Sequence, residues 1–189
     1  NFIGGHPMAG SEGSGYGAAE TTLFQRATPV LCAPADRAAS AGVWLVLTNA
    51  ANDADVPAQA LVFTLVQGPD FATLGPTNGI FAWRPAVAQA AATHTVRVAV
   101  TDSGWPALGA TQSFRVSVAP VGTAAVAAVS ATNGQFAFRV AGDSGLDYVL
   151  EATTDLSQWL PVSASNGATP PLSITVPVDT QAVRRMYRL

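Results

Sequence analysis

The sequence predicts an all-β protein: two tandem β-sandwich-like domains that follow a glycine-rich N-terminal arm. Three observations lead to this prediction. Apolar residues alternate with polar ones or run in short blocks, which is the pattern of short strands. Seventeen glycines and thirteen prolines interrupt these blocks. Helical periodicity is weak almost everywhere, and for residues 86–92, the one helix-permissive stretch, we expect a loop or a single turn.

The arm covers residues 1–28, in which the segment TTLFQR at 21–26 can form one strand. Residues 29–120 form the first predicted domain, a Greek-key sandwich of about seven strands. A Thr-Asn-Gly turn at 77–79 separates two of these strands. The clearest strands are expected at residues 29–33, 42–48, 61–66, 80–83, 93–101 and 113–118.

Residues 121–189 form the second predicted domain, a smaller β domain punctuated by Asn-Gly turns at 133–134 and 166–167. The alanine- and valine-rich stretch 121–130 is either a linker or a first strand. Five further strands are expected at residues 135–140, 147–153, 158–163, 172–176 and 185–189.

Composition excludes several classes of protein. The chain is 49% hydrophobic and 11% charged, whereas disorder needs low hydrophobicity and high charge. A net charge of −3 argues against a nucleic-acid partner, because binding phosphates needs a basic surface. All nine cationic residues are arginine, which excludes Schiff-base lysine chemistry and a P-loop. No run of 18 apolar residues occurs, so we expect no membrane span.

Residues that could bind a metal ion or act in nucleophilic catalysis are few and far apart in the sequence. Cys32 is the single cysteine, so no internal disulfide or multi-cysteine metal site can form. We expect it to be a small buried apolar residue, the alternative being a disulfide to another chain. His6 and His94 are far apart, which argues against a zinc or Ser-His-Asp site. Because the chain begins with Asn1 and shows no signal peptide, we interpret it as processed or as a fragment.

Several motifs of the first domain occur in a characteristic order. They are ANDAD at 51–55, GPD at 68–70, PTNGIFAWRP at 76–85 and VTDSGWPAL at 100–108. In these motifs the stretch 29–120 resembles the cadherin-like, Ig-like domains of exported bacterial surface proteins. The resemblance implies a seven-strand β-sandwich and a secreted or cell-surface location.

The second domain carries YVLEATTDLSQW at 148–159 and RMYRL at 185–189. This text resembles a small β module found at the C-terminus of many large exported bacterial proteins, and no activity follows from that resemblance.

The cadherin resemblance also implies a calcium site. Cadherin-type domains use an Asp-x-Asp pair on one loop and an Asp after a later strand, and Asp53, Asp55 and Asp102 match these positions. Asn52 can add a further oxygen. Calcium takes six to eight oxygen ligands, largely carboxylates on loops, so these residue types fit the ion.

The match to the cadherin calcium pattern is incomplete. Trp83-Arg84-Pro85 stands where cadherins carry an acidic motif, and 119–122 (APVG) replaces their acidic linker. Two usual sources of ligands are therefore missing. The alternative interpretation is that the aspartates form Asx-turns and cap loops.

Four tryptophans raise the question of carbohydrate binding, since exposed aromatic rings stack on sugar rings. Trp105, in the loop after Asp102, and Trp44, in a strand with one open face, are the candidate contacts. Trp83 and Trp159 fall at core positions of the resembled domains. The alternative for each tryptophan is packing in the core or against a loop.

An apolar surplus points to an interface. Residues 43–47 are apolar on both faces of a strand, although a sandwich buries only one. The outer face is then covered by a partner, by the second domain or by the arm. An extended arm can add a strand to a neighbour's sheet edge and build a fibre head to tail, with Phe2, Ile3, Leu23 and Phe24 as anchors.

No carboxylate pair suited to acid–base catalysis is recognisable among Glu12, Glu20, Asp147, Glu151 and Asp155, so we expect no enzyme activity. The sequence predicts a non-catalytic extracellular structural or adhesion protein, with a fibre subunit assembled through its arm as one form. The expected partner is a second copy, in a homo-oligomer or polymer, or a surface glycan. The alternative is an accessory module of a larger exported enzyme or adhesin, either carbohydrate-binding or a calcium-rigidified spacer.

Overall fold

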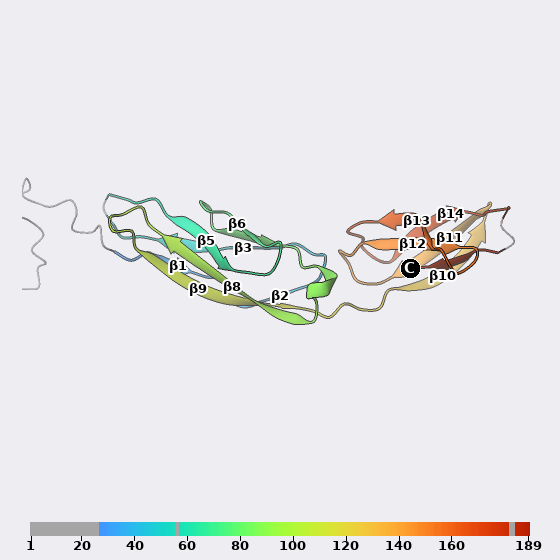
Figure 1. Ribbon diagram of the computed structural model, residues 1–189, viewed down its shortest axis with the longest axis horizontal. Coiled ribbons are helices and arrows are strands. Elements are labelled where there is room, and N and C mark those ends of the chain that lie inside the picture. Colours follow the sequence, from blue (N-terminus) through green and yellow to red (C-terminus); the bar gives the residue numbers. More distant parts are fainter. Residues whose placement is uncertain (1–26, 56, 182–183) are drawn as a thin grey trace, which may run out of the picture. The chain divides into compact units, whose positions relative to one another are not determined.

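The computed structural model describes residues 27–55, 57–181 and 184–189, and omits the side chain of Ala128. Within these ranges the chain is built of strands and one short 3₁₀ turn, which confirms the all-β prediction (Figure 1). No helix in the described residues is long and apolar enough to cross a membrane. The proposed arm anchors Phe2, Ile3, Leu23 and Phe24, and the strand expected at 21–26, lie outside the described residues.

Contacts divide the chain into two compact units. Unit 1 comprises Asn1–Asp36, Val46–Trp83 and His94–Arg115; unit 2 comprises Arg37–Leu45, Arg84–Thr93 and Val116–Leu189. Two short segments from the first half of the sequence thus group with the C-terminal residues, and the division of the chain into domains at residue 120 stays a prediction.

The strands of the first half of the chain form three sheets. Their orders are β1-β4, β3-β7-β6 and β2-β9-β8-β5, in which β2 is parallel to β9. The strands are β1 (Val30–Cys32), β2 (Arg37–Ala39), β3 (Leu45–Thr48), β4 (Ala50–Asn52), β5 (Val62–Gln67), β6 (Thr73–Leu74), β7 (Ile80–Trp83), β8 (Ala92–Thr101) and β9 (Gly109–Val118). The short strands β2, β4 and β6 were not expected from the sequence, because two or three residues cannot display an alternating pattern.

The core of unit 1 follows the predicted alternation. Along β8, Val96, Val98 and Val100 are fully buried, whereas Arg97 is exposed and Ala99 is half-buried between them. Trp83 is fully buried, as predicted. Nearby in the same unit, Phe81 meets Phe114 edge to face with ring centroids 5.6 Å apart. The period of two along β8 therefore gives one buried and one solvated face.

The Thr-Asn-Gly turn is present and has a clear physical basis. Gly79 has a φ of +65°, and a Cβ there would collide with the carbonyl oxygen of Asn49. The buried Asn49 in turn donates its side-chain Nδ2–H to the Gly79 carbonyl at 2.9 Å. Glycine is thus required both for backbone freedom and for close approach.

Unit 2 contains two three-stranded sheets of order β10-β11-β14 and β13-β12-β15, together with the 3₁₀ turn η2 (Val87–Gln89). Its strands are β10 (Ala125–Thr132), β11 (Gln135–Ala141), β12 (Tyr148–Thr153), β13 (Leu160–Ser165), β14 (Leu172–Pro177) and β15 (Met186–Arg188). The stretch left open as linker or strand is therefore mostly a strand, and the helix-permissive residues 86–92 make only a single turn.

The core of unit 2 is formed by side chains that alternate along its strands. Val140 and Leu150 are fully buried, and the other members are Ala41, Phe138, Leu146, Tyr148, Ala168, Ile174 and Val176. Tyr148 keeps a polar contact, since its hydroxyl donates to the Asp143 carbonyl at 2.7 Å. Burial raises the pKa of Tyr148, so the hydroxyl keeps the proton that it donates.

One prediction about burial is wrong. Cys32 is exposed and its thiol is free, although we expected a buried apolar residue. On β1 the buried position is Leu31, and alternation places Val30 and Cys32 on the opposite, solvated face.

Candidate functional site

Three predicted aspartates gather in unit 1. Asp53 and Asp55 lie on the loop after β4, and Asp102 follows β8 directly. One carboxylate oxygen of each lies within 4.8 Å of those of the other two. Asp55 and Asp102 are buried and Asp53 is half-buried. Asn52, the fourth predicted oxygen donor, is the last residue of β4 and is exposed.

Each loop uses one carboxylate oxygen to shape itself. Asp53 Oδ1 accepts the backbone N–H of Asp55 at 2.9 Å, which is an Asx-turn. Asp102 Oδ1 accepts the backbone N–H groups of Gly104 at 2.9 Å and Leu108 at 3.0 Å. These bonds fix the direction of each carboxylate and account for one oxygen of each residue.

The second oxygens are left without a partner. Asp53 Oδ2 and Asp102 Oδ2 are both buried and accept no hydrogen bond from any described residue. The side-chain oxygen of Gln59, on the loop before β5, is buried and unpartnered in the same way. Buried carboxylate oxygens normally have a hydrogen-bond donor, an ordered water or an ion as partner, so these oxygens are available to a ligand.

Gln59 joins the cluster through Asp55. Its side-chain Nε2–H donates to Asp55 Oδ2, while Asp55 Oδ1 accepts the backbone N–H of Ala27 at 3.0 Å. The sequence analysis missed Gln59, since a glutamine in a loop after Pro57 carries no motif. A side chain at position 104 would collide with the Gln59 amide, so Gly104 keeps space for it beside Asp102.

The electrostatics of the cluster favour a cation. Two unit charges about 4.8 Å apart repel by about 3.5 kcal/mol at an effective dielectric constant of about 20. Asp147, Asp179 and Glu151, which form ion pairs with arginines, all lie outside this cluster. The geometry therefore concentrates negative charge, and the donor set is made of oxygens alone, as hard divalent cations prefer.

Arg84 stands where the resembled domains carry an acidic motif, and it has a structural role within unit 2. Its guanidinium donates to the carbonyl oxygens of Gly42 at 2.6 Å and Gly145 at 2.8 Å. It also forms an ion pair with Asp147 at 3.7 Å. This position therefore supplies no cation ligand.

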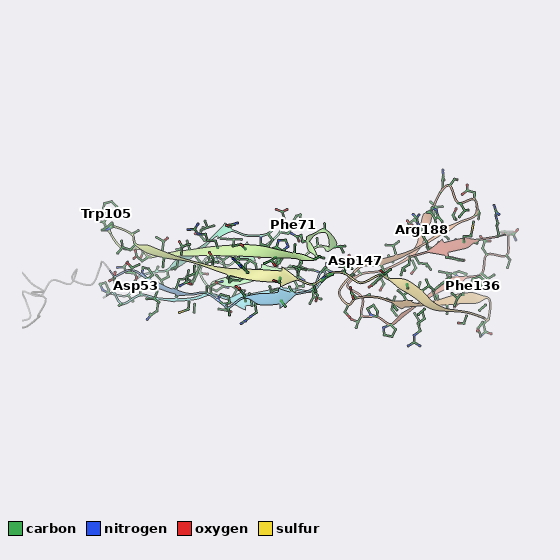
Figure 2. All side chains as sticks on the ribbon, turned by 90° about the horizontal axis from the view of Figure 1, so that it is seen from below. Asp53, Phe71, Trp105, Phe136, Asp147 and Arg188 are labelled. Carbon is green, nitrogen blue, oxygen red and sulfur yellow. The ribbon has the colours of Figure 1, made fainter. Side chains whose placement is uncertain are left out.

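The candidate carbohydrate contacts are exposed but separate. Trp105 is 91% exposed and projects from the same end of unit 1 as Asp53 (Figure 2). Phe71, which the sequence analysis did not consider, is 86% exposed and lies well apart from Trp105 in Figure 2. Trp44 is 63% exposed in unit 2. Trp159 is half-buried, with the Arg188 guanidinium 4.4 Å from its ring centroid.

Pockets described for unit 2 are small and shallow. One has a volume of about 300 Å³ and is lined by residues that include Arg84, Gly145 and Asp147. A second, of about 290 Å³, lies near Val162 and Arg185. Small-molecule sites usually have volumes of about 300–1,000 Å³, so these hollows fall at or below the bottom of that range.

Comparison with known proteins gives one short family match. Residues 1–47 match the model of the nucleotide-binding domain of prephenate dehydrogenase. The described part of this match, residues 27–47, holds strands and no helix. No curated protein matches the chain in sequence.

Solved structures with a similar arrangement include cadherin domains. The chain is similar to extracellular cadherin domains 1–5 of protocadherin gamma B2, with 16% identity, a TM-score of 0.45 and coverage of 52% of this chain and 21% of that one. The protocadherin gamma B4 extracellular domain matches at 14% identity and a TM-score of 0.45, over 82% of this chain and 34% of that one. A nucleoside hydrolase-related protein from Saccharophagus degradans matches at 16% identity and TM-score 0.39, over 56% of this chain and 28% of that one. The chain thus spans about a third or less of each of these structures.

Proposed function

We propose that the chain is a non-catalytic, extracellular protein of structural or adhesive function whose unit 1 is stabilised by a calcium ion. The observation that carries the proposal is the convergence of buried, unpartnered oxygens from Asp53, Asp102 and Gln59 beside Asp55. Calcium supplies a double positive charge that satisfies these oxygens and removes the repulsion among the carboxylates. The motif resemblance of residues 29–120 supports the extracellular assignment.

The residues that would hold the ion come from three separate segments of unit 1. Asp53 and Asp55 follow β4, Gln59 precedes β5 and Asp102 follows β8. An ion that links these segments ties together loops distant in sequence, which raises the free energy of unfolding. Such a site has a structural role and needs no substrate pocket.

Thermal unfolding of the full chain in calcium and in chelator tests this function. A ligand that binds only the native state stabilises it by about 2.7 kcal/mol at a concentration a hundred times its dissociation constant. We expect calcium to raise the melting temperature and magnesium to do so less, since magnesium demands a tighter octahedral site. Equal melting temperatures in calcium and in chelator would contradict the proposal.

Assembly through the N-terminal arm is a second proposal. It is supported by the exposed outer face of β3, where Val46 is 59% exposed and therefore available to a partner. We expect electron microscopy to show filaments for the full chain and none after deletion of residues 1–28. Filaments formed equally by the truncated chain would contradict a role for the arm.

Carbohydrate contact through Trp105 is a third proposal, favoured by the exposure of almost the whole side chain. In a polysaccharide-retardation gel we expect the full chain to be slowed by its ligand and Trp105→Ala to run unretarded. Trp44→Ala is the matched variant for the other exposed tryptophan. Retardation that persists in both variants would exclude both aromatic contacts.

A further inference from the structure

Among the described residues, no strand pairs with the outer edge of β10. The strand lies at one end of the sheet β10-β11-β14 and runs beside β11 (Figure 1). Seven of its eight side chains are described, and all seven are exposed. Its sequence, AVAAVSAT, contains no charge and no proline. A strand edge of this kind presents unpaired backbone N–H and C=O groups that another strand can bond.

The other edge strands of unit 2 carry features that block pairing. β14 ends in Pro177, β13 contains Pro161, and β15 is only three residues long and ends in Arg188. Prolines, charges and short length are the usual ways in which proteins prevent contact between sheet edges. β10 has one irregularity, a register shift between Val126 and Ala128, which leaves the pairing from Ala128 to Thr132 regular.

The side chains on one face of β10 lie next to the apolar core of unit 2 but stay partly exposed. Val126 lies opposite Val140, and Val129 lies opposite Phe138, so both valines face the core side of the sheet. Val140 and Phe138 are buried, yet Val126 is 38% and Val129 56% exposed. An occupant of this edge must therefore bring apolar side chains on one face as well as a free backbone.

We propose that this edge pairs with β10 of a second copy of the chain, antiparallel across a twofold axis, to make a continuous six-stranded sheet. A copy of β10 meets the requirement, since it offers the same free edge and apolar row. With the axis at Ser130, Val129 lies opposite Ala131 of the partner on the core side, and the two Ser130 residues lie opposite each other. An isologous contact of this kind closes after two copies.

Charge does not oppose this pairing. The nearest charge described on the sheet is Arg139 on β11, which lies opposite Ala128. In the joined sheet the two Arg139 residues are separated by both copies of β10. At about 4.8 Å per strand this is a distance of about 14 Å. Physiological salt screens charges beyond about 8 Å, so the two arginines interact weakly.

Lysine substitution at the two edges of the sheet tests the proposal. Ser130, Ala137 and Thr175 form one row across β10, β11 and β14, and Ser130 and Thr175 are both exposed. Ser130→Lys places two like charges opposite each other in the joined sheet, while Thr175→Lys puts the same charge on the opposite edge. Sedimentation equilibrium of the full chain, in chelator and from micromolar to millimolar concentration, measures the association.

We expect the wild type and Thr175→Lys to form dimers, and Ser130→Lys to weaken dimerisation at least about tenfold. A wild type that stays monomeric throughout, or two lysine variants that dimerise equally, would overturn the proposal. An open series of larger species that Ser130→Lys abolishes would also overturn it, because that pattern indicates donation of a different segment to the edge. Filaments assembled through the arm would be a separate contact that Ser130→Lys leaves intact. The same order of dimerisation among the three chains is therefore expected when residues 1–28 are deleted.

Disulfide trapping locates the contact. In a Cys32→Ser background, which removes the exposed native thiol, Ser130→Cys should give a covalent dimer under mild oxidation. Thr175→Cys in the same background should stay largely monomeric. Equal yields of covalent dimer from both variants would indicate random collision of the chains. That result would contradict strand pairing across a twofold axis.

Discussion

Asp155 in unit 2 forms the same kind of turn as Asp53 and Asp102 in unit 1. The three differ in whether the second carboxylate oxygen has a hydrogen-bond partner. Asp155, in unit 2, is exposed, and both of its oxygens are used. Oδ2 accepts the Ser157 hydroxyl at 2.6 Å, and Oδ1 accepts the Ser157 N–H at 2.9 Å and the Thr153 hydroxyl at 3.0 Å. In unit 1, Asp53 and Asp102 also accept backbone N–H bonds through one oxygen, but the other oxygen is buried and unpartnered.

This difference separates a turn from a candidate ion site. A sequence such as Asp102-Ser103-Gly104 or Asp155-Leu156-Ser157 predicts an Asx-turn equally well. At Asp155 the hydroxyl and N–H bonds of Ser157, together with the N–H of Gln158, hold the pKa of the carboxyl well below its usual range. At Asp102 the second oxygen is buried without a hydrogen-bond partner among the described residues, and the carboxylate lies in a cluster with those of Asp53 and Asp55.

The largest expected effect comes from Asp102→Asn. The variant keeps an oxygen for the N–H groups of Gly104 and Leu108, and it removes one of three clustered charges. In chelator it should melt at or above the temperature of the wild type, because the repulsion is lower. In saturating calcium the order should reverse, since only the wild type gains the stabilisation of about 2–3 kcal/mol.

Asp155→Asn is the matched control for this reversal, because it makes the same chemical change in a turn that is fully satisfied. It should gain as much stability from calcium as the wild type does. A calcium gain that survives in Asp102→Asn, or that vanishes in both variants, would break the distinction between the two groups.

Gly104→Ala should have an intermediate effect. The added methyl group would collide with the Gln59 amide and crowd Asp102 Oδ1. Gln59 can rotate away at small cost, so the free energy of unfolding in chelator should change little. Calcium affinity should fall about tenfold, which is about 1.4 kcal/mol, if the Gln59 oxygen is a ligand. An unchanged affinity, measured by titration with a calcium-competing dye, would remove Gln59 from the site.

The smallest expected effect is the pH dependence of Asp155. Its pKa is lower in the folded than in the unfolded state, where it is about 3.9, so the ionised carboxylate favours folding. That contribution is complete above about pH 5 and is lost as the pH falls below about 3.9 toward the folded pKa. The difference in melting temperature between the wild type and Asp155→Asn should therefore be largest at neutral pH and shrink in acid. A difference that stays constant from neutral to acidic pH would show that the turn bonds do not depend on ionisation.

Long strands with a regular alternation could be predicted from the sequence, whereas short or uniformly apolar ones could not. The long strand β8 was clear, because Val96, Val98 and Val100 recur at every second position and threonines precede and follow them. β10 was left open as linker or strand, since alanine and valine on both faces show no alternation. The strands β4 and β6 were missed because they are two or three residues long and are formed by pairing with neighbours.

The candidate site was partly accessible from the sequence. Asp53, Asp55 and Asp102 were found through motif order, and the structure places them together. Gln59 and the orphaned oxygens were not accessible, because burial of a particular atom depends on how three loops pack. Cys32 was misjudged for a related reason: its burial depends on which face of β1 turns inward, and Leu31 occupies that face.

Calorimetric titration of calcium into the full chain, beside Asp102→Asn, tests the central claim most directly. The account predicts one ion bound per wild-type chain and no binding by the variant, with Asp155→Asn binding as the wild type does. Absence of binding to the wild type would contradict the account. So would binding of equal stoichiometry and affinity by Asp102→Asn, because the buried oxygens of the cluster would then have no part in holding the ion.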